Sequence, residues 1–181
     1  YKVRMRGWVA PLLRSIRLRQ AVKNGFLFAG LVFAQRLPQL GETLRVAAGF
    51  LCFTLVTWAV YLGNDIRDRE LDRLHPRKCR RPLATGELAV GTAALWAALF
   101  AAAGLAGGFL IAPSFGACCV LYALLNLAYT LWLKHVVILD ILSIAAGFFL
   151  RVVAGALIIV VQISHWLMVC SIFLSLFLGF C

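Results

Sequence analysis

Long apolar runs separated by short polar stretches make up most of the chain. Runs long enough to cross about 30 Å of hydrocarbon as helices lie at 25–40, 44–63, 88–107, 114–133, 136–160 and 164–181. The first run is the weakest, because it is short and contains Arg36, whose side chain would have to reach the membrane interface. The pattern predicts an all-α, polytopic transmembrane helical bundle with about six helices.

No polar linker divides these runs, so we expect residues 1–181 to form a single transmembrane domain. The last apolar run continues up to Cys181. We therefore expect this domain to be truncated at its C-terminal end. The composition agrees with a membrane protein, because 63% of the residues are hydrophobic and only 14% are charged. A water-soluble domain of this size could not bury so much apolar surface.

Basic residues gather in every second connection between the apolar runs. Residues 1–23 contain seven basic residues and no acidic residue, residues 64–87 contain seven more, and Lys134 and His135 mark a third basic connection. Because positive charge favours the cytoplasmic side, we expect a multi-pass plasma-membrane protein with its N-terminus and loop 64–87 in the cytoplasm. The net charge of +11 does not predict nucleic-acid binding, since the basic residues flank membrane runs and form no stripe with interleaved aromatic residues.

Three aspartates follow the second apolar run. Asp65, Asp68 and Asp72, with Asn64 before them, spell N-D-x-x-D-x-x-x-D and would lie within about 60° of one another on a continuous helix. Carboxylates on one face repel unless a cation neutralises them, and hard oxygen ligands favour Mg²⁺, which also bridges to phosphate oxygens. The motif predicts that the three aspartates are metal ligands and catalytic residues, with Asn64 beside them in the substrate site.

A basic loop bracketed by Pro76 and Pro82 comes directly afterwards. Its candidate phosphate-binding residues are Arg77, Lys78, Arg80 and Arg81. Guanidinium groups suit bidentate phosphate binding, so the sequence predicts a site for Mg²⁺ and a phosphorylated substrate. Two simpler interpretations stay open: the loop is basic only because it is cytoplasmic, and Arg67, Arg69 and Arg73 merely pair with the aspartates.

Two ionisable residues lie inside the fifth apolar run. Asp140 is near its start and Arg151 near its middle, where insertion costs roughly 2.5 to 3.5 kcal/mol each. They share a helical face with Ser143 and Gly147, but they are about 16 Å apart along it and cannot neutralise each other within a straight helix. We expect both to line the substrate site. A structural ion pair to another helix is the alternative for each.

Three further residues are candidates for substrate binding. Tyr129 lies on the fourth run, and Lys134 ends that run with a cation suited to the helix dipole or to a phosphate. Lys23 precedes the first run. Tyr129 serves equally well as an interface anchor, and Lys23 is open to a similar interpretation.

The segment 64–72 resembles the first aspartate-rich motif of the UbiA superfamily of intramembrane prenyltransferases. The family often shows an arginine, glutamine and lysine-asparagine pattern, which R-Q-A-V-K-N at 19–24 resembles, followed here by R-P-L at 81–83. Within the superfamily, the chain most resembles the decaprenyl-phosphate phosphoribosyltransferase branch. The resemblance is carried by segments 75–78, 80–86, 129–135 and 147–151 and by Asp140.

The resemblance implies a bundle of about nine helices, of which about six are present here. It implies Mg²⁺ as cofactor, and phosphoribosyl pyrophosphate and a long polyprenyl phosphate as substrates. The implied reaction moves the 5-phosphoribosyl group onto the polyprenyl phosphate and releases pyrophosphate, for cell-wall arabinan precursor synthesis. The aspartates would hold Mg²⁺ against the pyrophosphate, while the loop cations and Lys134 neutralise its phosphates. The family's later aspartate-rich motif is not recognisable before Cys181.

Two other functions remain open. A UbiA-type prenyltransferase would use the same site for a prenyl diphosphate donor and an aromatic or other acceptor. A non-catalytic lipid-phosphate carrier would line a pathway with the polar face of the fifth run, although the sequence lacks matching broken helices in two halves. Nothing resembles a nucleophile elbow, a P-loop or a dinucleotide fingerprint, so serine chemistry, nucleotide hydrolysis and hydride transfer are not expected.

Overall fold

The computed structural model describes residues 7–133, 136–161 and 165–180, and these are mostly helical and contain no strand. The long helices are α3 (Leu40–Arg67), α6 (Val90–Ile111), α7 (Pro113–Leu131), α8 (Val137–Ile158) and α9 (His165–Phe180). The short elements are α1 (Val9–Ser15), the 3₁₀ helix η1 (Leu18–Phe28), α2 (Ala29–Phe33), α4 (Arg69–Leu74), the 3₁₀ turn η2 (Lys78–Arg80) and α5 (Pro82–Thr85). The predicted all-α fold is confirmed.

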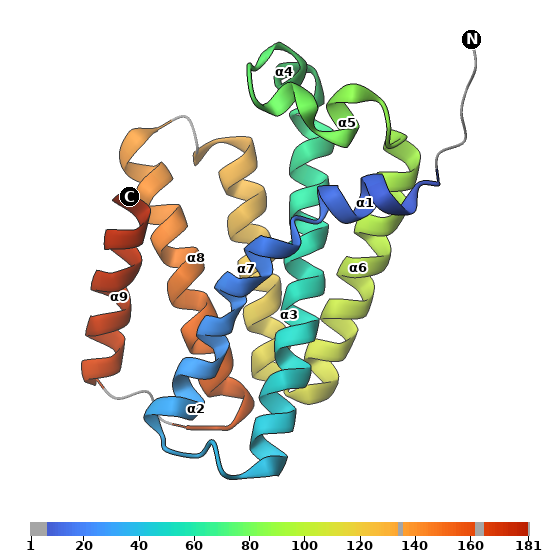
Figure 1. Cartoon of the computed structure of the whole chain (residues 1–181). Coiled ribbons are helices and arrows are strands. Elements are labelled where there is room, and N and C mark those ends of the chain that lie inside the picture. The colour runs from blue at the N-terminus through green and yellow to red at the C-terminus, as the bar shows by residue number, and fades with distance from the viewer. Residues whose placement is uncertain (1–6, 134–135, 162–164, 181) are drawn as a thin grey trace.

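The long helices stand side by side as a bundle, while η1 and α2 run obliquely across it and α9 lies at one edge beside α8 (Figure 1). Among the described residues, four helices are long and apolar enough to cross a membrane: α3, α6, α7 and the part of α8 from Ile138. The apolar part of α9, Met168–Phe177, is shorter. Five of the six predicted apolar runs thus correspond to one long helix each.

The first apolar run differs from its prediction. We expect one helix over residues 25–40, but the chain there forms the end of η1, then α2, and then a turn that leads to Leu40. Gln35 adopts a left-handed conformation in this turn (φ 55°), and Pro38 has no N–H to continue a helix. The prediction of a single spanning helix at 25–40 is therefore wrong.

Two glycines bring helices into direct contact. A Cβ atom on Gly104 of α6 would lie 2.7 Å from the carbonyl oxygen of Cys52 in α3. A Cβ atom on Gly155 of α8 would lie 1.8 Å from the carbonyl oxygen of Leu27 in η1. Neither position has room for a side chain. The two glycines therefore allow α6 to pack closely on α3 and η1 to pack closely on α8.

The main apolar core joins η1, α3, α7 and α8. It includes the fully buried side chains of Leu27, Phe53, Phe115 and Ile158. These contacts fix the four elements that surround the polar residues described below.

A second apolar cluster attaches the polar end of the molecule to the bundle. We call it the loop cluster, and its members are Leu12, Ile16, Leu62, Leu83, Leu88 and Ala93. It joins α1 and the segment around α5 to the last turns of α3 and the first turn of α6. Its position holds loop 64–87 and the N-terminal helix against each other.

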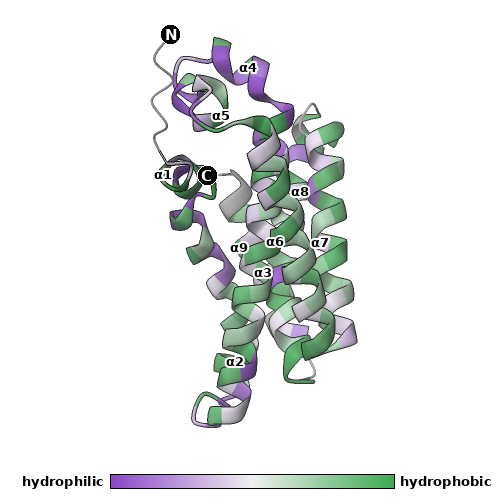
Figure 2. Cartoon of the chain, turned by 90° about the vertical axis from the view of Figure 1, so that its right-hand side faces the viewer, coloured by the Kyte–Doolittle hydropathy of each residue, from purple (hydrophilic) through white to green (hydrophobic). Residues whose placement is uncertain are grey.

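The connections alternate between the two ends of the bundle. α4 and α5 lie at one end, whereas the turns between α2 and α3 and between α6 and α7 lie at the other (Figure 1). Figure 2 shows hydrophilic residues gathered on α4 and around α5, with hydrophobic residues along the long helices. The basic loop 64–87 therefore lies at the opposite end of the bundle from these two turns.

Candidate active site

The aspartate motif lies where α3 passes into α4. α3 ends at Arg67, and Asp68 (φ −84°, ψ 5°) separates it from α4, which begins at Arg69. The prediction that the three aspartates share one continuous helix is therefore wrong. Backbone hydrogen bonding persists across the break, because the Asp68 N–H donates to the Asn64 carbonyl (2.9 Å) and the Asp72 N–H donates to the Asp68 carbonyl (2.8 Å).

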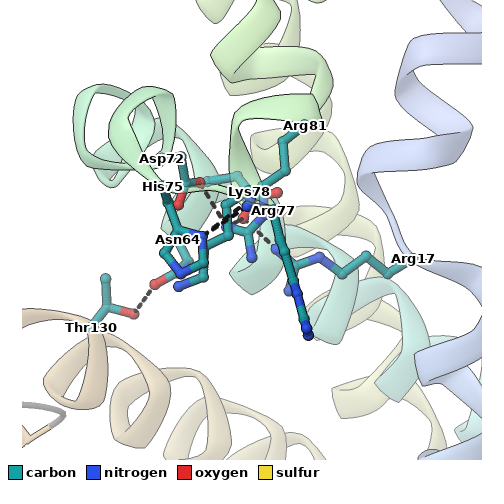
Figure 3. Close-up of polar contacts among 9 residues, drawn as sticks. Arg17, Asn64, Asp72, His75, Arg77, Lys78, Arg81 and Thr130 are labelled. Atoms are coloured by element: carbon teal, nitrogen blue, oxygen red, sulfur yellow. Dashed lines mark hydrogen bonds and ion pairs between the residues drawn. The ribbon is translucent and has the colours of Figure 1, made fainter.

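Two of the aspartates are buried and share one guanidinium group. Asp65 and Asp72 are only 2% and 3% exposed. Nη1 of Arg81 lies 3.0 Å from Oδ1 of Asp65 and 2.7 Å from Oδ2 of Asp72 (Figure 3). Nη2 of Arg17 lies 2.5 Å from the same oxygen of Asp65. The carboxylates thus converge on one cation although they belong to different helices.

The loop cluster places both arginines. Arg17 directly follows Ile16, which packs in this cluster. Arg81 lies two residues before Leu83, which packs in the same cluster, and its extended backbone leads into Pro82 at the first position of α5. Apolar packing therefore brings two cations from distant parts of the sequence to the aspartate motif.

Arg17 also has a strained backbone. It adopts a left-handed conformation (φ 51°, ψ 60°) between α1 and η1, which costs a non-glycine residue about 1–3 kcal/mol. Such strain persists only where surrounding contacts impose it, and here the residue contacts the buried carboxylate of Asp65. The strained position is thus one that reaches the candidate site.

The other loop cations are available to a ligand. Arg77, Lys78 and Arg80 are exposed, and in the described part of the chain no carboxylate forms an ion pair with them. Nδ1 of His75 accepts hydrogen bonds from the backbone N–H groups of Arg77 (3.2 Å) and Lys78 (3.3 Å). These bonds fold the loop directly after α4. The loop cations also follow the aspartate motif closely in the chain.

The simpler interpretation, in which Arg67, Arg69 and Arg73 pair with the aspartates, is not what the described residues show. Arg69 and Arg73 pair with Glu70, at 2.6 Å and 2.8 Å. The hydrogen bond from Arg69, with the charge of Arg73 nearby, holds the pKa of Glu70 below its ordinary value. Arg67 forms no ion pair within residues that the structure describes. The two buried aspartates use other arginines.

The donor set suits a hard cation. Among the described residues, no three His, Cys, Asp or Glu side chains are grouped as a metal site. The buried carboxylates of Asp65 and Asp72 nonetheless require positive charge, which Arg81 supplies, and carboxylate oxygens are the ligands that Mg²⁺ uses. The aspartate motif therefore fits Mg²⁺ by its chemistry, with Arg81 as the counter-ion in this structure.

A cavity of about 190 Å³ lies between η1, α3, α7 and α8, and we call it the polar cavity. Its polar lining consists of Lys23, Tyr61, Tyr122, Asn126, Tyr129, Ser143 and Arg151. Three of the predicted substrate-binding residues, Lys23, Tyr129 and Arg151, thus meet at one place although they come from three different helices.

Arg151 is buried among neutral partners in this cavity. It donates hydrogen bonds from Nε to Oδ1 of Asn24 (2.9 Å), from Nη1 to the Gly147 carbonyl (2.6 Å) and from Nη2 to the hydroxyl of Tyr122 (2.8 Å). Its Cζ also lies 4.9 Å from the ring centroid of Tyr122. No carboxylate pairs with it within the described ranges. The alternative of an interhelical ion pair is not found there, so its positive charge is available to an anion in the cavity.

Asn24 holds Arg151 in place. It is fully buried, and its side-chain amide donates to Oγ1 of Thr54 (3.0 Å) and Oγ1 of Thr57 (3.4 Å) in α3. The amide is therefore oriented with its oxygen toward the guanidinium, which links η1, α3 and α8 through one side chain.

The remaining predicted residues lie near these groups. Asp140 and Arg151 do not form an ion pair with each other, in agreement with their spacing, and the buried Oδ1 of Asp140 has no hydrogen-bond partner among the described residues. Asp140 is not part of the polar cavity's lining. Oδ1 of Asn64 accepts a hydrogen bond from the hydroxyl of Thr130 (3.0 Å, Figure 3). Lys134 lies outside the described residues.

The sequence did not lead us to assign a site role to three residues that position these groups: Arg17, Asn24 and Tyr122. Arg17 is one of seven basic residues before the first apolar run, and only its tertiary position distinguishes it from the others. Asn24 and Tyr122 are polar residues beside or within apolar runs, which is a usable indication of a polar partner on another helix.

Comparison with known proteins gives a consistent family. Residues 25–181 match the UbiA prenyltransferase family. The chain is 35% identical over 179 residues to the decaprenyl-phosphate phosphoribosyltransferase of Mycobacterium tuberculosis, covering 94% of this chain and 58% of that protein. It is 34% identical over 177 residues to the protein of the same name from Corynebacterium glutamicum, covering 93% and 52%. The chain therefore spans little more than half the length of these relatives.

A solved structure shows the same fold. The UbiA homolog from Archaeoglobus fulgidus, determined bound to DMAPP and Mg²⁺, matches with a TM-score of 0.73 and 22% sequence identity, over 91% of this chain and 60% of that chain. The family match covers nearly all of the helical bundle, including the aspartate motif and the polar cavity's α3, α7 and α8. Together with the long apolar helices, these findings show that the chain is an integral membrane protein of the UbiA prenyltransferase family.

Proposed function

We propose that the protein transfers the 5-phosphoribosyl group of phosphoribosyl pyrophosphate onto a polyprenyl phosphate such as decaprenyl phosphate, with release of pyrophosphate. The names of the Mycobacterium tuberculosis and Corynebacterium glutamicum relatives support this choice of reaction. The observation that carries it is the convergence of two buried carboxylates, Asp65 and Asp72, on Arg81 within a loop that also presents unpaired cations. Such a site combines ligands for Mg²⁺ with cations for phosphates.

In the proposed reaction, a phosphate oxygen of the lipid attacks C1 of the ribose. A bond forms between C1 and that oxygen, while the bond between C1 and the pyrophosphate oxygen breaks and pyrophosphate leaves with the electron pair. No protein nucleophile is required, so the protein contributes positioning and charge neutralisation. When bound to Asp65, Asp68 and Asp72, Mg²⁺ would neutralise charge on the leaving pyrophosphate.

The remaining candidate residues divide between two phosphate-binding regions. At the loop, Arg77, Lys78 and Arg80 are exposed cations that would bind the phosphates of the water-soluble donor, and we assign Lys134 the same role. In the polar cavity, Lys23 and Arg151 supply positive charge, and Arg151 has no counter-ion within the described residues. Substrate phosphates would therefore find cations both at the polar end of the bundle and between its helices.

We further propose that loop 64–87 faces the cytoplasm of a plasma-membrane protein, because seven basic residues favour that side and phosphoribosyl pyrophosphate is a water-soluble donor. The lipid product would serve cell-wall arabinan precursor synthesis, as the family resemblance implies.

A transfer assay tests this function. The full-length protein in detergent is given Mg²⁺, polyprenyl phosphate and phosphoribosyl pyrophosphate labelled in the ribose, and the lipid phase is extracted and counted. We expect label in the lipid phase, and we expect Asp68→Asn to lower the rate by roughly 100-fold or more, the scale of losing one preorganised electrostatic group. Glu70→Gln is the matched control, because it removes an exposed carboxylate of the same loop whose ion-pair partners, among the described residues, are Arg69 and Arg73.

Each rival function predicts no label in the lipid phase of this assay and a positive result in a second assay. Unlabelled lipid together with prenyl transfer from a prenyl diphosphate to an aromatic acceptor would identify a conventional UbiA-type prenyltransferase. Unlabelled lipid together with movement of lipid phosphate across liposomes would identify a carrier. Near-normal transfer by Asp68→Asn would remove that aspartate from the chemistry.

A further inference from the structure

The short helix α1 lies across the bundle instead of along it. It crosses α3 and α6 near the end of the bundle that carries α4 and α5 (Figure 1). Both crossed helices are long and apolar enough to span a membrane. A helix that crosses them near the polar end therefore lies roughly parallel to the membrane surface. The proposed transfer reaction makes no use of this helix.

The exposed side of α1 has an apolar flank and a basic flank. The opposite side is buried in the loop cluster, whereas Val9 and Leu13 are 49% and 47% exposed. Arg14 lies about 100° around the helix from Leu13 and about 140° from Val9. Its guanidinium forms an ion pair with Glu87, which lies just before α6 at the polar end of the molecule. The apolar flank therefore faces away from that end.

Trp8 indicates the depth of α1. Its ring stacks on that of Trp96 in α6, with centroids 5.4 Å apart, and Trp8 is itself 49% exposed. Trp96 lies six residues after Val90, the first residue of α6, which places it about 9 Å along that helix. Tryptophan favours the membrane interface, because its ring is apolar and its N–H is polar. The stacked pair therefore places the start of α1 at the level of the lipid head groups.

The residues around α1 are basic. Arg19 is exposed, and no carboxylate among the described residues forms an ion pair with it. Lys2, Arg4 and Arg6 precede α1 in the sequence, and the first acidic residue in this sequence is Glu42. Anionic head groups attract such a cluster of cations. The charge at this end of the chain thus complements an anionic lipid surface.

The chain passes from α1 directly into the candidate active site. Arg17 follows the last residue of α1 by two positions and contacts the buried carboxylate of Asp65. Its Cζ also lies 5.1 Å from the ring centroid of Tyr61 in α3. The strained backbone of Arg17 forms the turn between α1 and η1. Because surrounding contacts must impose this strain, the position of α1 bears on the contact between Arg17 and Asp65.

We infer that α1 is a membrane-surface helix that binds a bilayer containing anionic phospholipid, and that this binding keeps Arg17 in contact with Asp65. Trp8, Val9 and Leu13 enter the apolar edge of the bilayer, while the neighbouring cations meet the phosphates of the head groups. The phospholipid surface thereby supports the candidate active site from outside the bundle.

Photo-crosslinking tests what covers the apolar flank. The full-length variant Leu13→benzoylphenylalanine is reconstituted in vesicles of phosphatidylcholine and phosphatidylglycerol with labelled acyl chains and is then irradiated. Leu74→benzoylphenylalanine is the matched control, because Leu74 is an exposed leucine of α4 in the polar loop. We expect at least about ten times more lipid adduct from position 13 than from position 74. Adducts from position 13 that contain only protein, from the same chain or from a second copy, would overturn the inference.

Hydrogen exchange tests the link to Arg17. The backbone N–H of Gln20 donates to the Arg17 carbonyl (2.7 Å), so its exchange reports whether this turn is in place. In nanodiscs containing phosphatidylglycerol, Leu13→Asp should speed exchange at Gln20 at least about tenfold, because a carboxylate is costly at the apolar edge of a bilayer. Ala10→Asp places the same group on the flank of Arg14 and should match the wild type. Equal exchange rates in the two variants would overturn the link.

The charge of the lipid is tested with the wild-type protein. We expect exchange at Gln20 to be at least about threefold slower in nanodiscs of phosphatidylglycerol than in nanodiscs of phosphatidylcholine. This difference should disappear in about 1 M salt, which screens the head-group charge. The same rate in both kinds of nanodisc would overturn the binding of anionic phospholipid. None of these experiments requires a substrate, so their outcome is independent of phosphoribosyl transfer.

Discussion

At the scale of single residues, Arg81 balances the charge of the aspartate motif. Its guanidinium contacts both buried carboxylates, whereas Arg17 pairs with one of them, Asp65. Arg81 is therefore the counter-ion that a bound metal ion would have to replace or supplement, since the same oxygen atoms serve either cation. This exchange makes a prediction about stability that is independent of catalysis.

Arg81→Gln should destabilise the protein and make its stability depend on Mg²⁺. Removing one partner of a buried ion pair costs roughly 3–5 kcal/mol, and because the Arg81 side chain is 23% exposed we expect a loss of about 3 kcal/mol. Thermal unfolding in detergent, with and without Mg²⁺, measures the effect. We expect Mg²⁺ to raise the Tm of this variant more than that of the wild type. Arg80→Gln, which removes an exposed cation beside it, should match the wild type, and equal Tm values for all three proteins would contradict the assignment.

Arg151 makes a second prediction at this scale. Arg151→Lys keeps the charge but loses the planar guanidinium group, which donates hydrogen bonds to Asn24, Gly147 and Tyr122. We expect the KM for phosphoribosyl pyrophosphate to rise about tenfold, and Arg151→Met to raise it further. Tyr122→Phe removes one acceptor and leaves the cation, so its effect should be smaller. An unchanged donor KM in Arg151→Met would exclude an anion-binding role for this residue.

At the scale of elements, hydropathy predicts the long helices well and local breaks poorly. The membrane requires continuous apolar helices, so the runs that became α3, α6, α7 and α8 are evident in the sequence. The break at Asp68 and the turn before Leu40 depend on a few backbone angles, which residue type constrains only weakly. The helix break at Asp68 matters most for the candidate site, because it places Asp65 and Asp72 on different helices. The cation that both carboxylates contact, Arg81, belongs to neither helix.

The close packing of η1 on α8 makes a prediction at the element scale. Gly155→Ala would place a methyl group 1.8 Å from the Leu27 carbonyl oxygen, so one helix must shift. Overpacking of this kind costs about 1–3 kcal/mol, and thermal unfolding in detergent measures it. Gly91→Ala in α6 is the control, because its added methyl group would meet no atom within 4 Å. If the two variants unfold at the same temperature, the contact between η1 and α8 is not as close as described.

At the scale of the whole molecule, the site combines residues whose partners the sequence does not reveal. The aspartate motif and the basic loop adjoin in the chain, so their association is predictable from spacing alone. The contact between Arg17 and Asp65 joins residues 48 positions apart, and that between Arg151 and Asn24 joins residues 127 positions apart. Only the packing of the bundle determines these pairs. The site residues therefore remain predictions that activity measurements must test.

Pyrophosphate release from the full-length protein in detergent with Mg²⁺ tests the central claim most directly. One sample contains phosphoribosyl pyrophosphate with polyprenyl phosphate, and the other contains prenyl diphosphate with an aromatic acceptor. The proposed function predicts release only in the first sample and loss of that release when a chelator removes Mg²⁺. Release only in the second sample, or in neither sample from a folded protein, would contradict it.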